Sequence, residues 1–213
     1  MTTDNLAKRS DLHLKRRIWH VLCGVICLTL HYTTNSKIIH WGYFSLFIAF
    51  LGFIIDFQRF KNEKLNNFLG KHFGPIMRKS ERLNFSGLPF YALGVALSIF
   101  LYDEKIATLS ILYLIFSDPV ASIFGVYFGR DVLLPNKTLQ GTIAAFVTCL
   151  VVTLIYFYIL EIHSPNIIIF AFLASMFGAL SEIISAFNID DNLTIPVVSG
   201  AVLTGLNVLF NVF

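Results

Sequence analysis

The sequence predicts an all-α integral membrane protein, and three observations support this: its composition, its long apolar runs and the placement of its positive charge. Of its 213 residues, 56% are hydrophobic and only 14% are charged, whereas a soluble domain has about 25% charged residues. The mean hydropathy is +0.71. Apolar runs of bilayer length, about 17–25 residues, account for such a composition. An ordinary soluble domain is therefore excluded.

Seven apolar runs are candidates for membrane-spanning helices. They are Ile18–Thr34, Ile38–Phe57, Gly87–Tyr102, Ile106–Phe128, Thr142–Ile162, Ile167–Phe187 and Thr194–Phe213. The third run is short, and His20 and His31 interrupt the first. All seven are continuous, whereas the strands of a membrane barrel alternate apolar and polar residues. We therefore expect about seven transmembrane helices in a single membrane domain, residues 1–213.

The basic residues predict the orientation of these helices. Seven spans bring the tail 1–17, the loop 58–86 and the loop after the fourth run to one face, and 14 of the 16 Lys and Arg residues lie there. The opposite face has only Lys37 and Lys105. Because Lys and Arg are retained on the cytoplasmic side, we expect a cytoplasmic N-terminus. Anionic lipid headgroups are sufficient partners for these residues, so we expect no nucleic-acid partner.

The loop 58–86 has an amphipathic pattern. Phe60, Leu65, Phe68 and Leu69 fit one face of a helix, with Lys and Asn residues between them. Such a pattern is typical of a helix that lies along the surface of a membrane. We interpret it as an anchor on the inner leaflet, with guidance of a lipid towards a site as the alternative.

Asp118 lies deep inside the fourth run, about ten residues or roughly 15 Å before its cytoplasmic end. Ionisable residues within a membrane are costly, so each is a candidate for function. Pro119 follows Asp118, and an aspartate cap followed by proline is favourable at the start of a helix. We therefore expect the fourth helix to break at Asp118-Pro119 and to resume at Val120. The alternative is a kink without a chemical role, at which neighbouring groups satisfy the carboxylate.

Further acids lie at the same predicted face. Glu182 is near the end of the sixth run, and Asp190, Asp191 and Asn192 follow in a loop without Lys or Arg. We expect Pro196 to open the last helix, because proline favours a first helical turn. Mg²⁺ takes oxygen ligands, usually one or two carboxylates together with phosphate. These acids and Asp118 therefore predict a magnesium site, with a solvated turn as the alternative for the loop.

Groups that can bind phosphate surround these acids. Arg78, Lys79 and Glu81 precede the third helix, and Arg130 follows the fourth. Lys137-Thr138-Leu139-Gln140-Gly141 opens the fifth helix, where backbone N–H groups favour an anion. Both charge signs on one face are what metal-assisted phosphoryl chemistry requires. The nearby GxxxG spacing, Gly125 and Gly129, favours close helix packing.

These motifs resemble those of the polyprenol kinase family, which includes dolichol kinases, phytol and farnesol kinases and CTP-dependent diacylglycerol kinases. The resemblance follows the chain in order through Arg16–His20 with Gly24, then Arg78, Glu81, Gly87, Tyr91 and Gly94, then Ser117–Gly125 with Gly129 and Arg130, then Asn136–Thr142, and finally Glu182 with Asp190–Pro196. The last run, Asp-Asn-Leu-x-Ile-Pro, is the most specific. Ser117 departs from the family, which usually has glycine before the aspartate.

The resemblance implies transfer of a γ-phosphoryl group, from CTP and with Mg²⁺, to a lipid alcohol at the cytoplasmic leaflet. For such a reaction, the chemistry of the residues leads us to the hypothesis that Asp118, Lys137 and Glu182 have catalytic roles. The magnesium ligands would be Asp118, Glu182, Asp190 and Asp191. The residues that bind nucleotide or phosphate would be Arg78, Lys79, Glu81, Arg130, Lys137, Thr138, Gly141 and Asn192. Isoprenoid alcohols and diacylglycerol both fit such a site as acceptors.

Two other functions are consistent with parts of the sequence. A phosphatidate cytidylyltransferase is similar over the stretch Asp118–Gly141. A transporter coupled to cations or protons would also need buried acids. The basic clusters beside the acids, on one face only, argue against a transporter. All three hypotheses describe a multi-pass integral membrane protein, and both enzymes would have an active site facing the cytoplasm.

Overall fold

The computed structural model describes residues 14–77, 81, 83–184 and 190–213. A helix lies within or across each of the seven apolar runs. These helices are α1 (Leu14–Thr34), α2 (Ile38–Lys61), α4 (Gly87–Leu101), α5 (Glu104–Phe128), α6 (Leu139–Ile159), α7 (Ile167–Ile184) and α8 (Asp191–Phe210). Five of them, α2 and α5–α8, are long and apolar enough to cross a membrane, and α4 is a shorter apolar helix. The predicted integral membrane protein is confirmed at this level. The crossings by α1 and α4 remain predictions.

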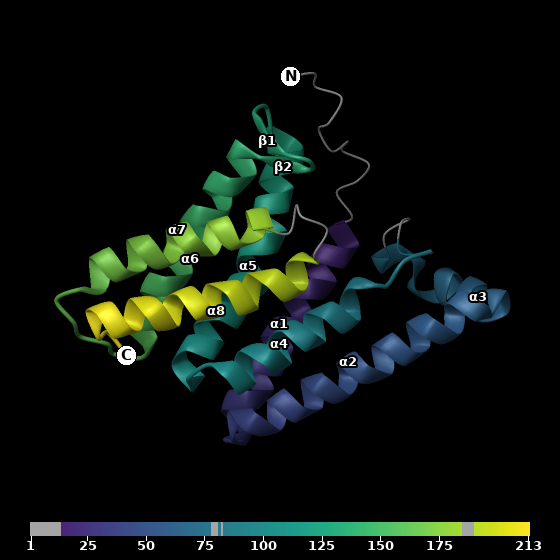
Figure 1. Ribbon diagram of the computed structural model, residues 1–213, viewed down its shortest axis with the longest axis horizontal. Helices are drawn as coiled ribbons and strands as arrows, with labels where there is room; N and C mark the ends of the chain where they lie inside the picture. Colours follow the sequence, from purple (N-terminus) through teal and green to yellow (C-terminus); the bar gives the residue numbers. More distant parts are fainter. Residues whose placement is uncertain (1–13, 78–80, 82, 185–189) are drawn as a thin grey trace.

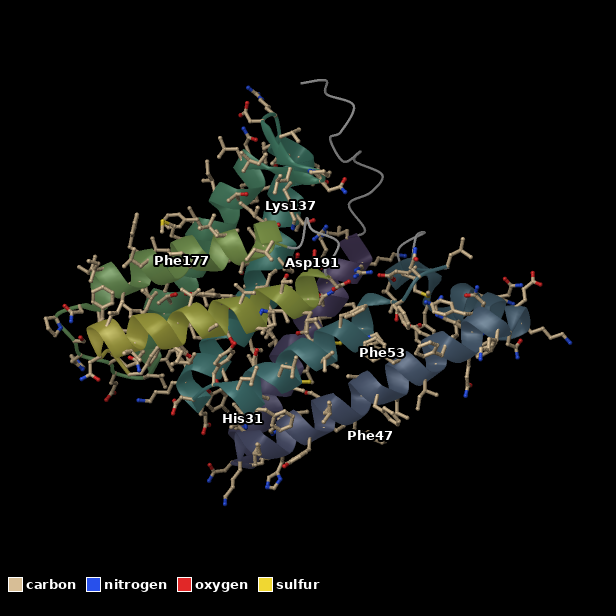
Figure 2. The ribbon with its side chains drawn as sticks, viewed as in Figure 1. His31, Phe47, Phe53, Lys137, Phe177 and Asp191 are labelled. Atoms are coloured by element: carbon tan, nitrogen blue, oxygen red, sulfur yellow. The ribbon has the colours of Figure 1, made fainter. Side chains whose placement is uncertain are left out.

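Helix α5 is the centre of the bundle (Figure 1), in contact with α1, α4, α6, α7 and α8. Most of its residues from Ile106 to Ala121 are buried, and Tyr113 Oη lies 2.5 Å from Thr153 Oγ1 of α6. Helix α2 lies at the edge and packs mainly on α4. Its outer aromatic residues, such as Phe47, point away from the bundle (Figure 2). An exposed apolar surface of this kind is expected where a helix faces lipid.

The predicted break in the fourth helix is wrong. Helix α5 runs without interruption from Glu104 to Phe128, with Pro119 inside it, and Pro196 likewise lies inside α8 rather than opening it. Proline removes one backbone donor from the helix. A full break would release more backbone groups into an apolar interior, where nothing satisfies them. Ser117, Asp118 and Pro119 are all buried between helices, so packing holds the segment in helical form.

The loops contain three further elements. The helix predicted in the loop 58–86 is α3 (Glu63–Phe73). Asn62 caps its start, with Oδ1 accepting from the backbone N–H of Leu65 at 3.2 Å. A 3₁₀ turn, η3 (Gly74–Ile76), follows it. Strands β1 (Val132–Leu134) and β2 (Lys137–Thr138) form an antiparallel hairpin. Asn136 turns this hairpin with φ of 62°, a conformation that asparagine tolerates better than most residues. The hairpin is a small departure from the predicted all-α fold.

The alternating helices bring the polar motifs to one end of the bundle. This end, called the site end below, consists of the starts of α1, α4, α6 and α8 and the ends of α2, α5 and α7. Figure 2 shows Lys137 and Asp191 at the site end and His31 at the opposite end. Segments separated by more than a hundred residues in the chain therefore meet there.

Candidate functional site

A buried ion pair lies at the core of the site. Lys137 Nζ on β2 donates a hydrogen bond of 2.7 Å to Glu182 Oε1 near the end of α7, and the two side chains are only 14% and 6% exposed. Burial alone would lower the pKa of Lys137. The nearby carboxylates, Glu182 foremost, outweigh that effect and raise this pKa above its ordinary value. Lys137 is therefore a fixed positive charge at neutral pH.

Two more acids act on Lys137. The charges of Asp191 and of Asp118 both add to the raised pKa of this lysine, after that of Glu182. Asp118 is buried in α5, and Asp191 is the first residue of α8. We call these four residues the lysine cluster. It consists of the Lys137–Glu182 ion pair and two further carboxyl groups, on α5 and α8, whose charges act on the same ammonium group, an arrangement that suits a cation bound together with an anion.

The carboxyl groups of this cluster do not form a complete metal cage. Among the residues that the structure describes, no three His, Cys, Asp or Glu side chains are grouped closely enough to hold a metal ion. Mg²⁺ that arrives with a nucleotide needs only one or two protein carboxylates, because phosphate oxygens and water supply the rest. The residues present therefore fit a nucleotide-bound Mg²⁺ and do not fit a metal held by protein alone.

The hairpin and the start of α6 position Lys137. Gln140 Oε1 accepts from the backbone N–H of Arg130 at 2.9 Å, while its Nε2 donates to Asp131 Oδ2 at 2.7 Å. Thr138 caps α6, with Oγ1 accepting from the N–H of Gly141 at 3.2 Å. These bonds tie the loop on both sides of Lys137 to the helix that follows it.

Gly125 and Gly141 allow α5 and α6 to approach closely. A Cβ at Gly141 would lie 2.8 Å from the carbonyl oxygen of Ala121, and one at Gly125 would lie 3.2 Å from Thr138 Oγ1. The GxxxG spacing thus contributes to packing between α5 and α6, as predicted. Thr138 and Gly141, predicted to bind phosphate, also have this packing role.

The run Asp190–Pro196 begins α8 and packs against α4. Asp190 Oδ1 caps the helix, accepting from the backbone N–H of Asn192 at 3.0 Å and from its Nδ2 at 2.6 Å. Gly94 of α4 faces the backbone of Asn192 and the ring of Pro196 so closely that any side chain there would collide with both. The most specific motif of the resemblance is therefore a rigid helix start that fixes Asn192 and Asp191 in place.

Two arginines of α1 reach into the site end. Arg16 forms an ion pair with Glu81 and lies against Gly87 together with Asn192, while Arg17 donates to Ser122 Oγ on α5. Neither arginine was a predicted site residue, because both were counted with the basic tail. Their position immediately before an apolar run that contains His20 was the available signal.

His20 extends this contact by one turn of α1. Its Nε2 donates to the carbonyl oxygen of Leu114 at 2.9 Å, and its ring meets that of Tyr91 edge to face, with centroids 4.7 Å apart. Helix α1 is thus joined to both α5 and α4 beside the site.

A second buried ion pair holds the end of the loop 58–86. Arg59 Nε donates to Asp56 Oδ1 at 2.6 Å, and the side chains of the pair are 1% and 4% exposed, respectively. Asp56 Oδ2 also accepts from the backbone N–H of Ser86 at 2.8 Å and from its hydroxyl at 2.9 Å. The sequence reasoning missed Asp56, although a carboxylate inside an apolar run was the same signal that identified Asp118. We call the pairs Arg16–Glu81 and Asp56–Arg59 the paired cluster.

A cavity of about 260 Å³ lies beside the paired cluster. Helices α1, α2, α3 and α4 and the turn η3 form its wall, and Asn192 at the start of α8 closes one side. All four residues of the paired cluster line it, and most of the remaining wall is apolar. The site end therefore has two parts, the lysine cluster and this cavity, with Asn192 at the cavity side of α8.

The structure thus places the predicted site residues differently. The charges of Asp118, Glu182 and Asp191 act on Lys137, Glu81 and Asn192 lie at the cavity, Thr138 and Gly141 pack at the start of α6, and Asp190 caps α8. Arg130 is exposed on the hairpin loop. Arg78 and Lys79 lie outside the described residues.

Comparison with known proteins identifies a family and several relatives. Residues 7–187 match the Cytidylyltransferase family. The CTP-dependent diacylglycerol kinase 1 of Schizosaccharomyces pombe is 29% identical, over 95% of this chain and 96% of its own length. The protein of the same name from Saccharomyces cerevisiae is 32% identical, over 87% of this chain and 70% of its own.

A bacterial relative extends the comparison. Uncharacterized protein RP860 of Rickettsia prowazekii is 30% identical, over 87% of this chain and 90% of its own length. No solved structure is significantly similar to this chain.

Proposed function

This chain belongs to the Cytidylyltransferase family and is similar to CTP-dependent diacylglycerol kinases over most of its length; from that premise we propose that it is a CTP-dependent lipid kinase with a diacylglycerol or polyprenol acceptor. The observation that supports this most is the lysine cluster. It joins a buried, permanently charged Lys137 to three carboxyl groups from separate helices. A triphosphate and its cation need both kinds of group.

The reaction exchanges one phosphorus–oxygen bond for another. The bond between the γ-phosphorus of CTP and the β–γ bridging oxygen breaks, and CDP leaves with that oxygen. A new bond forms between the γ-phosphorus and the hydroxyl oxygen of the lipid. The hydroxyl proton passes to a carboxylate of the lysine cluster, Asp118 or Glu182, because a buried carboxylate within hydrogen-bond reach can act as general base.

The other residues bind and orient the nucleotide. Lys137 neutralises phosphate charge from the fixed position that the hairpin gives it. Arg130 and the helix start at Thr138 lie on the same loop and would contact the remaining phosphates, as would Arg78 and Lys79. Mg²⁺, when bound, would supply further neutralisation of the phosphates, and one or two of the carboxylates of Asp118, Glu182 and Asp191 would hold it. Asp190, also predicted as a ligand, caps α8.

We also propose an orientation. Helices α1 and α4 would cross the membrane together with the five longer apolar helices, and the site end would face the cytoplasm because the basic segments lie there. On this proposal residues 1–213 form one membrane domain, and Lys37, Lys105 and His163 face the opposite side.

A phosphatidate cytidylyltransferase is the second candidate, favoured by the description of the matched family. It would bind CTP at the same carboxylates, but the phosphate group of phosphatidate would attack the α-phosphorus of CTP and pyrophosphate would leave. The diacylglycerol kinase relatives favour phosphoryl transfer.

An acceptor panel tests the proposed function. The purified protein is reconstituted in vesicles with labelled CTP and, in turn, diacylglycerol, a dolichol, phytol and phosphatidate. We expect a lipid phosphate from at least one alcohol, with diacylglycerol as the best substrate, and no product from phosphatidate. Turnover of phosphatidate alone would refute the kinase assignment and support the second candidate.

A further inference from the structure

The cavity between α1, α2, α3 and α4 has the properties of a binding site for a neutral lipid, and we propose that it holds the lipid alcohol while the lysine cluster holds the nucleotide. This inference rests on the proposed function and adds to it the location and the charge class of the acceptor. Four features support it: the composition of the wall, its charge balance, its mouth and its continuity with the lysine cluster.

The wall combines a few charged groups with a larger apolar area. Arg16, Glu81, Asp56 and Arg59 lie where α1, α2 and the loop before α4 meet, and Ile76, Met77 and Leu69 contribute apolar side chains from the loop. Along α1 the wall extends from Arg16 to Cys23, about 10 Å at 1.5 Å per residue. A pocket with apolar walls and a few placed polar groups is typical of a small-molecule site. An amphipathic ligand fits it best.

The charges of the wall favour an uncharged ligand. Among the described wall residues, the two arginines and two carboxylates form two ion pairs, Arg16–Glu81 and Asp56–Arg59. Arg59 has further donors engaged, by Asn66 Oδ1 at 3.3 Å and by the carbonyl oxygen of Asn84 at 2.5 Å. A phosphate group brought here would have to compete with these carboxylates for the arginines. A neutral hydroxyl and ester groups face no such competition.

The mouth of the cavity is apolar. Trp19, Ile55, Phe73 and Leu88 line the cavity, yet they are 51%, 45%, 50% and 55% exposed. They come from α1, α2, α3 and α4, so each of the four helices contributes an exposed apolar side chain to the border of the cavity. Large exposed apolar groups at an opening are expected where the contents enter from lipid rather than from water. The acyl or isoprenoid chains would leave the protein through this mouth.

Asn192 connects the cavity to the lysine cluster. Its side chain forms part of the cavity wall, and its neighbour Asp191 belongs to the cluster around Lys137. The Asp190 cap and the packing against Gly94 hold both residues on one rigid helix start. A hydroxyl at this side of the cavity is therefore on the side from which the nucleotide phosphates are bound.

A pair of neighbouring substitutions on α3 tests the proposal. Leu69 lines the cavity, whereas the adjacent Phe68 is exposed and does not line it. In vesicles containing dioleoylglycerol, Leu69→Trp is expected to raise the KM for the lipid about tenfold, which corresponds to about 1.4 kcal/mol of lost binding. The KM for CTP should change by less than about twofold, because the substitution weakens the binding of the lipid and leaves the nucleotide site unchanged. Phe68→Trp is expected to leave both constants unchanged.

Equal KM values for the lipid in Leu69→Trp and Phe68→Trp, with lipid phosphate still produced, would refute the cavity as the acceptor site and leave the kinase assignment intact. Photo-crosslinking without CTP tests the cavity in the opposite case, in which the kinase assignment fails but the cavity still binds the neutral lipid. A diacylglycerol with a photoreactive group near its glycerol is expected to label the wall around Ile55, Leu69 and Met77, even if no turnover occurs. Unlabelled dioleoylglycerol should compete, and phosphatidate at the same mole fraction should not. Equal competition by phosphatidate, or labelling only elsewhere, would overturn the neutral-lipid assignment.

Discussion

The two polar clusters at the site end differ in their balance of charge. In the lysine cluster one lysine is paired with Glu182, and the charges of Asp118 and Asp191 act on it as well. In the paired cluster each arginine has its own carboxylate, Arg16 with Glu81 and Arg59 with Asp56. The first cluster has an excess of negative charge that a bound cation can neutralise. In the second cluster the positive and negative charges already balance.

This difference assigns the clusters to different partners. A triphosphate with Mg²⁺ brings both negative and positive charge, and carboxylates with a nearby lysine can bind both. A neutral lipid brings neither, so its site needs charges only where they already neutralise each other. On this view one end of the bundle holds a water-soluble donor and a membrane-soluble acceptor on the two sides of the same helix start, at Asn192.

Removal of divalent metal should have the largest effect and should act on one cluster only. With excess EDTA we expect complete loss of turnover, because the acids and the triphosphate repel each other without a bridging cation. Crosslinking of the neutral lipid to the cavity should continue under the same conditions. Mg²⁺ or Mn²⁺ is expected to restore activity. Full turnover in EDTA would remove the reason for assigning the acids to metal.

Asp118→Asn removes one negative charge from the lysine cluster and leaves the paired cluster unchanged. Because α5 is continuous at Asp118, the residue does not cap a helix, and Asn has a similar helix propensity. We expect normal folding and a fall in kcat of at least about 10²-fold, the lower end for loss of an acid–base group. Expression and melting temperature in detergent serve as controls for folding. A variant with wild-type turnover would exclude Asp118 from the chemistry.

Lys137 and Glu182 should depend on each other for stability. Lys137→Met leaves a buried carboxylate without its cation and is expected to cost about 3–5 kcal/mol, seen as a lower melting temperature. Glu182→Gln in the same protein should recover most of this loss without restoring activity. Lys105→Met, at an exposed position on the opposite end, is the matched control and should change neither the melting temperature nor the activity. Equal destabilisation by the single and double variants would show that the pair is not coupled.

Much of the architecture could be predicted from the sequence. Long apolar runs specify helices strongly, because a chain in lipid has few other ways to satisfy its backbone. The same logic identified Asp118 and Glu182, since a buried carboxylate requires a partner. The amphipathic spacing around Phe68 and Leu69 predicted α3. Alternation of the helices then brought the predicted motifs to one end.

The remainder could not be predicted, because it depends on contacts between distant segments. A local rule for proline predicted a break at Pro119 and a helix start at Pro196, but packing and backbone satisfaction outweigh one lost donor. Arg16 and Glu81 belong to separate motifs of the resemblance, and only the fold shows that these residues, 65 positions apart, form an ion pair. The fold also shows that Arg16 of α1 and Glu81 of the loop line a common cavity.

The chemical identity of the transferred group is the most direct test of the account. Two parallel reactions in diacylglycerol vesicles would use CTP labelled at either the α- or the γ-phosphorus, with lipids and soluble products separated afterwards. A kinase transfers the γ-label to lipid and leaves the α-label in CDP, and this is the result we predict. Appearance of the α-label in lipid, with the γ-label in pyrophosphate, would contradict it.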